Sequence, residues 1–316
     1  MSLALVFPGQ GAQTIGMGRA LADSSPAARA VFQEVDDALG EALSALIWKG
    51  DIAELTLTAN AQPALMATSM ATLRALEAEG FDIRQAAFVA GHSLGEYSAL
   101  AAAGALSLGD TARLLRIRGR AMQEAVPVGQ GAMAALLGLD FGSASEIAAE
   151  AAQGQICQAA NDNDPAQVVV SGDKAAVERA VELAKARGAR RAVLLPVSAP
   201  FHCALMQPAA DAMAAALADV AVKAPAVPLV ANVRAEAVSD PDTIRRLLVE
   251  QVTGSVRWRE SMVWMTGQGV TQFWEVGAGK ALSGMIKRVA KGAETRAIAS
   301  PEDVAGAMDS LSGDSA

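Results

Sequence analysis

The chain has 316 residues, of which 52% are hydrophobic and 19% charged, and its formal net charge is -8. This composition is typical of a folded globular protein with a large core and excludes extended disorder. The acidic balance argues against general nucleic-acid binding, which needs a basic surface. No stretch approaches ~18 uninterrupted apolar residues, so we expect no membrane span.

The chain contains two cysteines, Cys157 and Cys203, with neither metal-ligand spacing nor a pattern of pairs. We therefore expect reduced thiols, no metal site and a cytoplasmic protein. The first residues, MSLALVFPGQG, have no basic segment before a short apolar run. We interpret them as a first strand rather than a signal peptide.

Short apolar runs alternate with helical patterns along most of the chain. Residues 3–7 predict a buried strand, and residues 63–80 predict a helix that ends at a glycine. A second buried strand is expected at 86–91, followed at once by a helix at 94–106. Residues 271–277 predict a later strand. This order is typical of an α/β fold with a mainly parallel sheet.

The middle of the chain has a different order of elements, β-α-β-β-α-β, which is the ferredoxin-like arrangement. The expected elements are a strand at 131–139, a helix to about 153, strands at 155–160 and 167–172, a helix at 173–188 and a strand at 190–197. We therefore predict a small ferredoxin-like subdomain at 126–197. It would be inserted into a large discontinuous α/β core made of residues 1–125 and 198–316.

Residues 91–95, GHSLG, match the G-x-S-x-G nucleophile elbow and lie between a predicted strand and a predicted helix. In α/β-hydrolase-like proteins this sharp turn exposes the serine hydroxyl, here that of Ser93, above the sheet. The start of the following helix would place the amide of Leu94 next to developing negative charge. The alternative is a glycine-rich turn without a catalytic role.

Ser93 needs a base, and the chain has only two histidines. Successive side chains in extended backbone point to opposite faces, so we expect His92 to point away and to support the turn. We therefore favour His202, in a loop after an apolar strand, although an ordinary loop histidine is the alternative. The acid that would orient it stays open, and a backbone carbonyl would serve equally. The acidic candidates are Asp240, Asp242, Glu250 and Glu275.

Two glycine-rich segments also raise the possibility of phosphate or oxyanion binding. FPGQGAQ (7–13) lacks the Lys-Ser/Thr of a P-loop, so a phosphate cradle, a backbone amide beside the nucleophile and a plain turn all stay open. VGAGKAL (276–282) favours a helix start over a phosphate loop.

Basic residues gather in three places. The segment around 113–120 carries four arginines, most of which we expect in solvent, with one turned into the cleft to bind a carboxylate. The other two clusters run from Lys185 to Arg191 and from Lys287 to Lys291. Solvated helix ends are favoured there, and docking of an anionic cofactor or an acidic carrier protein is the alternative.

Several motifs occur together in one order. They are FPGQGAQ, QPAL (62–65), GHSLGEYSAL (91–100), RG..MQEAVP (118–127), GAMAALLGL, PFHCALM (200–206) and EVGAGKALSGMIKR (275–288). With these motifs, which span nearly the whole chain, the sequence resembles the malonyl-CoA:acyl carrier protein transacylases of type II fatty acid synthesis. The fold of that family, an α/β core with an inserted ferredoxin-like subdomain, agrees with the prediction above.

The resemblance implies an acyl transfer in two steps, with no permanently bound cofactor. The serine takes malonyl from malonyl-CoA and then passes it to the phosphopantetheine thiol of acyl carrier protein. By motif position, Ser93 corresponds to the nucleophile, His202 to the general base and Arg118 to the arginine that binds the substrate carboxylate.

The resemblance also assigns supporting roles. The backbone amides of Gln10 and Leu94 correspond to the oxyanion hole, and the backbone carbonyl of Gln251 corresponds to the group that orients the histidine, so no acid is needed. Phe201 stands where many relatives carry a small residue, and resemblance to malonyl-selective domains suggests that its ring crowds the acyl α-carbon. We therefore hypothesise a preference for malonyl over methylmalonyl.

Three other functions compete with this reading. A serine esterase or thioesterase shares the elbow, but it has no need for Arg118 and usually has its acid between serine and histidine in chain order. A transacylase of polyketide synthesis would carry nearly the same motifs. A non-catalytic protein that only binds acyl carrier protein would form no acyl-enzyme.

Overall fold

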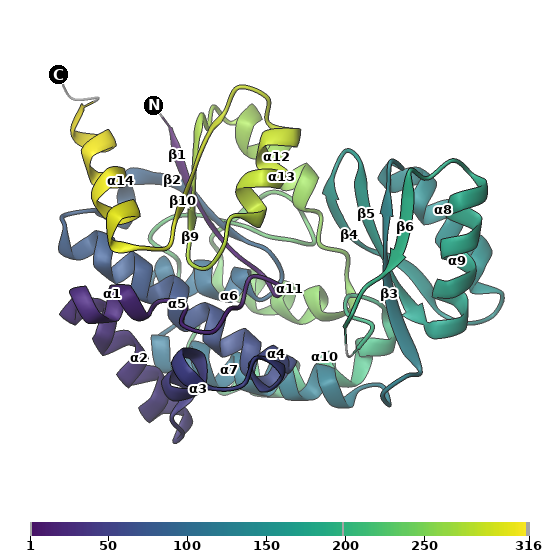
Figure 1. Cartoon of the computed structure of the whole chain (residues 1–316), viewed down its shortest axis with the longest axis horizontal. Helices are drawn as coiled ribbons and strands as arrows, with labels where there is room; N and C mark the ends of the chain where they lie inside the picture. The colour runs from purple at the N-terminus through teal and green to yellow at the C-terminus, as the bar shows by residue number, and fades with distance from the viewer. Residues whose placement is uncertain (1, 198, 314–316) are drawn as a thin grey trace.

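The computed structural model describes residues 2–197 and 199–313 and contains two sheets that lie side by side (Figure 1). Residue 198, where the predicted second part of the core begins, and residues 314–316 at its predicted end lie outside the described residues, as does residue 1. The larger sheet has six strands in the order β10-β9-β1-β2-β7-β8. Their bounds are β10 Glu294–Ile298, β9 Gln272–Val276, β1 Leu3–Phe7, β2 Ala86–Gly91, β7 Leu229–Val230 and β8 Ala237–Val238.

All neighbours in this sheet are parallel except β7 and β8, which pair antiparallel. The predicted mainly parallel sheet is therefore confirmed, as are the predicted strands at 3–7, 86–91 and 271–277. Parallel strands need cover on both faces, and β1 is buried at every position. Its side chains alternate between two apolar clusters: Leu5 and Phe7 belong to one, and Ala4 and Val6 to the other.

Helices cover both faces of the larger sheet (Figure 1). The helices on the face of Leu5 and Phe7 include α5 and α6, and those on the other face are α12 and α13. The helices of this part are α1 Arg19–Ser24, α2 Pro26–Leu39, α3 Leu43–Lys49, α4 Ile52–Thr56, α5 Thr58–Ala78, α6 Gly95–Ala102, α7 Leu108–Glu124, α10 Gln207–Ala218, α11 Pro241–Thr253, α12 Trp258–Gly267, α13 Ala281–Val289 and α14 Pro301–Gly313. Two 3-10 turns, η1 Ile83–Gln85 and η2 Ala204–Met206, complete it.

Two of the predicted helices differ from the observed ones at their ends. Helix α5 begins at Thr58 rather than at residue 63, so Pro63 lies inside it. It is buried on all sides over most of its length, and tertiary packing outweighs the poor helix propensity of proline there. Helix α6 ends at Ala102, four residues before the predicted end, because Gly104 adopts a left-handed conformation with φ 72°.

The smaller sheet is antiparallel, with the strand order β4-β5-β3-β6. Its elements are β3 Gly131–Leu137, α8 Phe141–Ala152, β4 Cys157–Asp164, β5 Gln167–Asp173, α9 Lys174–Ala186 and β6 Arg191–Leu194. The predicted order of strands and helices in this segment is confirmed. Helices α8 and α9 pack on one face of the sheet, where they form an apolar cluster of their own (Figure 1). Met133 and Val169 on the other face join the cluster of the larger part.

Backbone and side-chain contacts join the two sheets. The amide of Asp162 in β4 donates to the carbonyl of Val256, which precedes α12, over 2.9 Å. The buried carboxylates of Asp162 and Asp164 form ion pairs with Arg259 and Arg288 at 2.9 and 2.7 Å. Removing one partner of such a pair leaves a buried charge uncompensated, so the contacts hold the two sheets in one arrangement.

Among the described residues, no helix is both long and apolar enough to cross a bilayer.

Candidate active site

Ser93 lies on a sharp turn between the end of β2 and the start of α6. Its φ is 54°, in the left-handed region that non-glycine residues seldom adopt. The flanking glycines are required by space: a Cβ on Gly91 would lie 1.9 Å from the carbonyl oxygen of Gly95, and one on Gly95 would lie 2.3 Å from the carbonyl oxygen of Phe7. The segment therefore has the geometry of a nucleophile elbow.

His202, 109 positions further along the chain, lies beside Ser93. Its Nε2 is 2.7 Å from the Ser93 Oγ, and its Nδ1 is 2.9 Å from the backbone carbonyl oxygen of Gln251. Because a carbonyl only accepts, Nδ1 carries the proton and Nε2 is free to accept one from the serine hydroxyl. Burial, with the nearby charge of Arg118, lowers the pKa of His202 to about 3. The imidazole is therefore neutral near pH 7, as a general base must be.

His92 points away from the Ser93 hydroxyl. Its Nε2 is 2.9 Å from the Oδ1 of Asn163 in β4, and its ring lies 5.6 Å from the ring of Trp258, centroid to centroid. Burial lowers the pKa of His92 as well. The side chain thus links the turn to the smaller sheet.

Arg118, on α7, has only 1% of its surface exposed. Its Nη1 donates to Gln62 Oε1 at 2.7 Å, and its Nη2 donates to Gln251 Oε1 at 2.8 Å and to Ser93 Oγ at 3.1 Å. In the described part of the chain no carboxylate forms an ion pair with it. Burial lowers the pKa of Arg118, and a buried cation with only neutral direct partners is suited to bind an anion.

The other arginines of α7 differ from the expectation in one case. Arg113 and Arg120 are exposed, but Arg116 is buried, so the expectation that most are solvated is wrong for it. Arg116 Nη1 donates to the carbonyl of Ala59 at 2.7 Å. This carbonyl lies four residues before Pro63, which has no N–H to donate to it, so Arg116 replaces a missing helix bond.

None of the four acids proposed for orienting His202 takes that place. Asp240 caps α11 through the amide of Thr243, and Asp242 and Glu250 are exposed on the same helix. Glu275 is fully buried but accepts from the amides of Leu282 and Ser283 at the start of α13, at 3.0 and 2.7 Å. Its carboxylate therefore fills the helix end next to VGAGKAL, which leaves no room there for a phosphate.

A cavity of about 480 Å³ surrounds Ser93 and lies between the two sheets. The predicted site residues that line it are Gln10, Ser93, Leu94, Arg118, Phe201 and His202. Leu94 is the N-cap of α6, so its amide lies outside the hydrogen-bond pattern of the helix. Residues of the smaller sheet such as Asn161 and residues of α13 such as Leu282 complete the wall.

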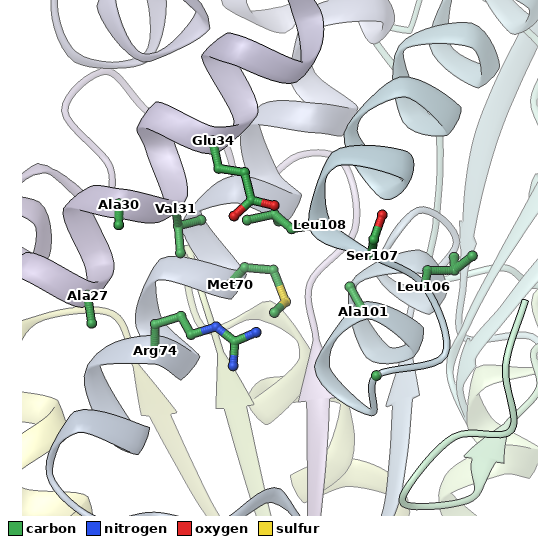
Figure 2. Close-up of a pocket in the computed structure, with 11 residues that line it drawn as sticks. Ala27, Ala30, Val31, Glu34, Met70, Arg74, Ala101, Leu106, Ser107 and Leu108 are labelled. Carbon is green, nitrogen blue, oxygen red and sulfur yellow. The ribbon is translucent and has the colours of Figure 1, made fainter. Parts of the chain in front are cut away.

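A second hollow, of about 400 Å³, lies among α2, α5 and the start of α7 (Figure 2). Small and apolar side chains line most of it, and Figure 2 shows Met70 and Arg74 extending into it. Arg74 is paired with Glu77. No predicted site residue lines this hollow, and no group of three or more metal-ligand side chains occurs among the described residues.

Three polar residues at the site had no role in the sequence interpretation. Gln62 holds Arg118, and Glu96 and Asn232 bind each other and the backbone around Ser93. Glu96 gives a signal in the sequence, because it is an acid in an otherwise apolar, alanine-rich helix. Asn232 gives none, since a single asparagine after a short apolar run is common in loops.

Comparison with known sequences identifies the family. The family described as "Acyl transferase domain" matches residues 4–310. The chain is 46% identical over 310 residues to the malonyl CoA-acyl carrier protein transacylase of Bacillus subtilis, covering 98% of this chain and 97% of that protein. It is 47% identical over 306 residues to the enzyme of the same name from Escherichia coli K12, covering 97% and 98%.

Solved structures agree with this result. An acyl-carrier-protein-S-malonyltransferase from Bartonella henselae superposes with a TM-score of 0.97 at 56% identity, covering 99% of this chain and all of that one. A malonyl-transacylase in complex with its type II PKS acyl-carrier protein gives a TM-score of 0.95 at 43% identity, covering 98% and 100%. The chain belongs to the acyl transferase family, and its resemblance to the malonyl CoA-acyl carrier protein transacylases is confirmed.

Proposed function

We propose that the chain transfers a malonyl group from malonyl-CoA to the phosphopantetheine thiol of acyl carrier protein through an ester on Ser93. The observation that carries the proposal is the joint geometry of Ser93, His202 and Arg118. A neutral base and a buried cation, which forms no ion pair with a carboxylate among the described residues, both contact the hydroxyl of the nucleophile. The relatives named for malonyl transfer support the same substrate.

In the first half-reaction, Ser93 Oγ attacks the thioester carbonyl of malonyl-CoA while His202 Nε2 takes the hydroxyl proton. The amides of Leu94 and Gln10 stabilise the resulting oxyanion. The tetrahedral intermediate then expels coenzyme A, whose sulfur takes the proton from His202. The carbonyl of Gln251 holds the Nδ1 proton throughout and stabilises the imidazolium.

In the second half-reaction, the phosphopantetheine thiol gives its proton to His202 Nε2 and attacks the Ser93 ester. Collapse of the second intermediate releases malonyl thioester and returns the proton to Ser93 Oγ. Water would give hydrolysis instead, and the cavity between the two sheets restricts its access.

Arg118 binds the free carboxylate of the malonyl group. Its Nη2 donates to Ser93 Oγ and Gln251 Oε1, which places the guanidinium, and with it the bound carboxylate, within reach of the nucleophile. An acetyl group offers no anion and leaves the buried cation unpaired, which disfavours its transfer.

Phe201, next to His202, lines the same cavity and would crowd a branched α-carbon. We therefore expect Phe201→Ser to raise kcat/KM for methylmalonyl-CoA relative to malonyl-CoA by about tenfold or more, since one methyl group in a pocket contributes about 1–3 kcal/mol. An unchanged ratio of the two values would contradict this role.

The order of the strands and helices supports a division of the chain into a core and an inserted subdomain. We propose that residues 126–197 form a ferredoxin-like subdomain inserted into an α/β-hydrolase-like core. The element order β-α-β-β-α-β and the antiparallel sheet support the first part. The turn at Ser93, at the end of a parallel strand, supports the second.

We propose that acyl carrier protein docks at the two basic clusters. The similar malonyl-transacylase structure that contains an acyl-carrier protein supports such a protein as the partner. Lys185 and Arg187 are paired with Glu182 and Glu150, and Arg288 is paired with Asp164. The remaining cluster residues are exposed and form no ion pair in the described part of the chain: Arg190, Arg191, Lys287 and Lys291. These four are available to an acidic partner. A cytoplasmic location stays a prediction.

Intact-protein mass spectrometry tests the proposed reaction. We expect one malonyl adduct after mixing with malonyl-CoA, absent in Ser93→Ala and removed by phosphopantetheine-loaded acyl carrier protein. Ser98→Ala is the matched control, because Ser98 is a buried serine on α6, the helix that follows Ser93, and its hydroxyl has no hydrogen-bond partner among the described residues. Loss of the adduct to water faster than to the carrier protein would indicate a thioesterase. The absence of any adduct would leave a binding protein.

A further inference from the structure

Asn232 is a buried residue that braces the turn at Ser93. It follows the short strand β7, and its side chain spans the turn: Nδ2 donates to the carbonyl of Gly91 at 2.7 Å, and Oδ1 accepts from the amide of Ser93 at 2.8 Å. One side chain thus binds the backbone on both sides of His92. Because Ser93 has the strained φ of 54°, the turn depends on such contacts to keep its shape.

Glu96 holds Asn232 and Gln251 together. It lies in the first turn of α6 with 1% of its surface exposed, and its Oε2 accepts from the amide of Asn232 at 3.1 Å and from Gln251 Nε2 at 2.7 Å. The same Gln251 Nε2 also donates to the carbonyl of Ser93 at 3.0 Å. The carboxylate therefore connects the brace of the turn to the residue that contacts the histidine.

Gln251, which Glu96 binds, contacts both His202 and Arg118. Its backbone carbonyl accepts from His202 Nδ1, and its side-chain Oε1 accepts from Arg118 Nη2. The side-chain amide of Gln251 thus lies between an anion and a cation: its Nε2 donates to the carboxylate of Glu96, and its Oε1 accepts from the guanidinium of Arg118. With a neutral residue in place of Glu96, the side-chain amide of Gln251 could rotate by about 180°. Its N–H groups would then face the guanidinium of Arg118, which has no acceptor for them.

We propose that Glu96 and Asn232 are positioning residues of the transfer reaction: Asn232 fixes the backbone of the nucleophile turn, and Glu96 fixes Gln251, whose backbone carbonyl contacts His202 and whose side-chain amide contacts Arg118. Neither side chain is assigned a contact with substrate. The inference rests on the proposed function, because it assigns the two residues to that same site.

The chemistry of Glu96 argues against a purely structural role. Burying a carboxylate is costly, and well-packed apolar residues often replace buried charges without loss of stability. Burial raises the pKa of Glu96 to about 7, although Gln251, Asn232 and Arg118 all favour its charged form. The carboxylate of Glu96 and the guanidinium of Arg118 bind opposite ends of the Gln251 side-chain amide. The charge of Glu96 therefore serves to orient this amide rather than to stabilise the fold.

The test is the rate at which malonyl-CoA acylates Ser93, followed by rapid quenching and intact-protein mass spectrometry. We expect Asn232→Ala to lower this rate by about 10²-fold and Glu96→Gln by about tenfold, mainly in the maximal rate, since small displacements of reacting groups have effects of this size. Glu275→Gln is the matched control. It removes the charge of another buried glutamate that accepts two N–H groups, away from the hydroxyl of Ser93, and should leave the rate unchanged.

A double-mutant cycle separates positioning from a general loss of structure. If Glu96 acts through Gln251 on Arg118, adding Glu96→Gln to Arg118→Ala should change the rate by less than about twofold. Fully additive effects, or folded single variants that acylate at the wild-type rate, would overturn the inference. A wild-type chain that forms no adduct would instead overturn the proposed function. Glu96→Gln is nearly isosteric, so it keeps the test open if Asn232→Ala fails to fold.

Discussion

Two turns at the carboxyl edge of the larger sheet have the same plan and different uses. In each, a parallel strand ends in a glycine-rich segment and a helix begins: β2 leads to α6, and β9 leads to α13. At the start of α13, Glu275 fills the helix end with its own carboxylate. At the start of α6, Leu94 lines the cavity, and the carboxylate of the nearby acid, Glu96, binds Asn232 and Gln251 instead of the helix end.

The difference shows how the same strand-turn-helix structure serves either to stabilise the fold or to form part of a binding site. A helix N-terminus attracts negative charge wherever it occurs. If the chain supplies that charge, the turn is closed and stabilises the fold. If the chain supplies no such carboxylate and places a nucleophile and a base beside the turn, the same turn is suited to receive the negative charge of a reaction intermediate, as we propose for Leu94.

Removing the base should have the largest effect at the open turn. His202→Ala should lower the rate of Ser93 acylation by roughly 10²- to 10⁴-fold, because proton transfer by a positioned base contributes this much. The rate is measured by quenched-flow mass spectrometry with malonyl-CoA. Ser98→Ala, on α6 itself, should acylate normally. Retention of near wild-type rates in His202→Ala would mean that another group accepts the proton.

Removing the cation should change the choice of substrate. Arg118→Ala should lower kcat/KM for malonyl-CoA by about 10²-fold, as expected when one partner of a buried charge pair is lost. Acylation by acetyl-CoA should change far less. Arg116→Ala is the control, since Arg116 is a buried arginine of the same helix that serves α5 and lies outside the cavity lining. Equal losses for both substrates in Arg118→Ala would contradict the carboxylate contact.

The pH dependence should report Glu96 rather than His202. The pKa of His202 is lowered to about 3, so the base stays neutral over the working range, whereas the pKa of Glu96 is raised to about 7. A raised pKa means that Glu96 loses its charge as the pH falls through about 7, beside Arg118 and Tyr97. Acylation should therefore fall about fivefold from pH 8 to pH 6, because the uncharged form is expected to keep about a tenth of the rate. The same profile should be flat in Glu96→Gln, and a limb that persists there would assign it to another group.

Changing the closed turn should affect stability and leave chemistry alone. Glu275→Gln should lower the free energy of unfolding by about 1–3 kcal/mol, because it weakens two hydrogen bonds to a buried charge. Denaturant titration measures the loss, and the acylation rate of the folded fraction is the companion reading. A large fall in that rate would show that the two turns are not separate in function.

Much of the fold followed from local patterns. The buried strands at 3–7 and 86–91 and the turn at Ser93 were predictable from short apolar runs and from the glycines on both sides of the serine. His202 was the predictable base because the other histidine, His92, directly precedes Ser93, and neighbouring side chains in extended backbone point to opposite faces. These inferences needed few residues and no distant contacts.

The remaining features depend on contacts that no local pattern contains. Helix α5 extends past Pro63 because packing on all sides and the arginine of α7 compensate for the missing bond. Asn232 and Glu96 gain their roles only when β7, α6 and α11 meet. A catalytic histidine predicts an acid in contact with its ring, whereas the buried acid of this site, Glu96, contacts Gln251, and the backbone carbonyl of Gln251 contacts His202.

The account as a whole is tested most directly by a crystal structure of the chain after brief exposure to malonyl-CoA. It predicts a malonyl ester on Ser93 Oγ, with the free carboxylate within hydrogen-bond distance of the Arg118 guanidinium and the ester oxygen facing the amides of Leu94 and Gln10. A malonyl group attached to another side chain, or an ester on Ser93 whose carboxylate lies away from Arg118, would contradict it.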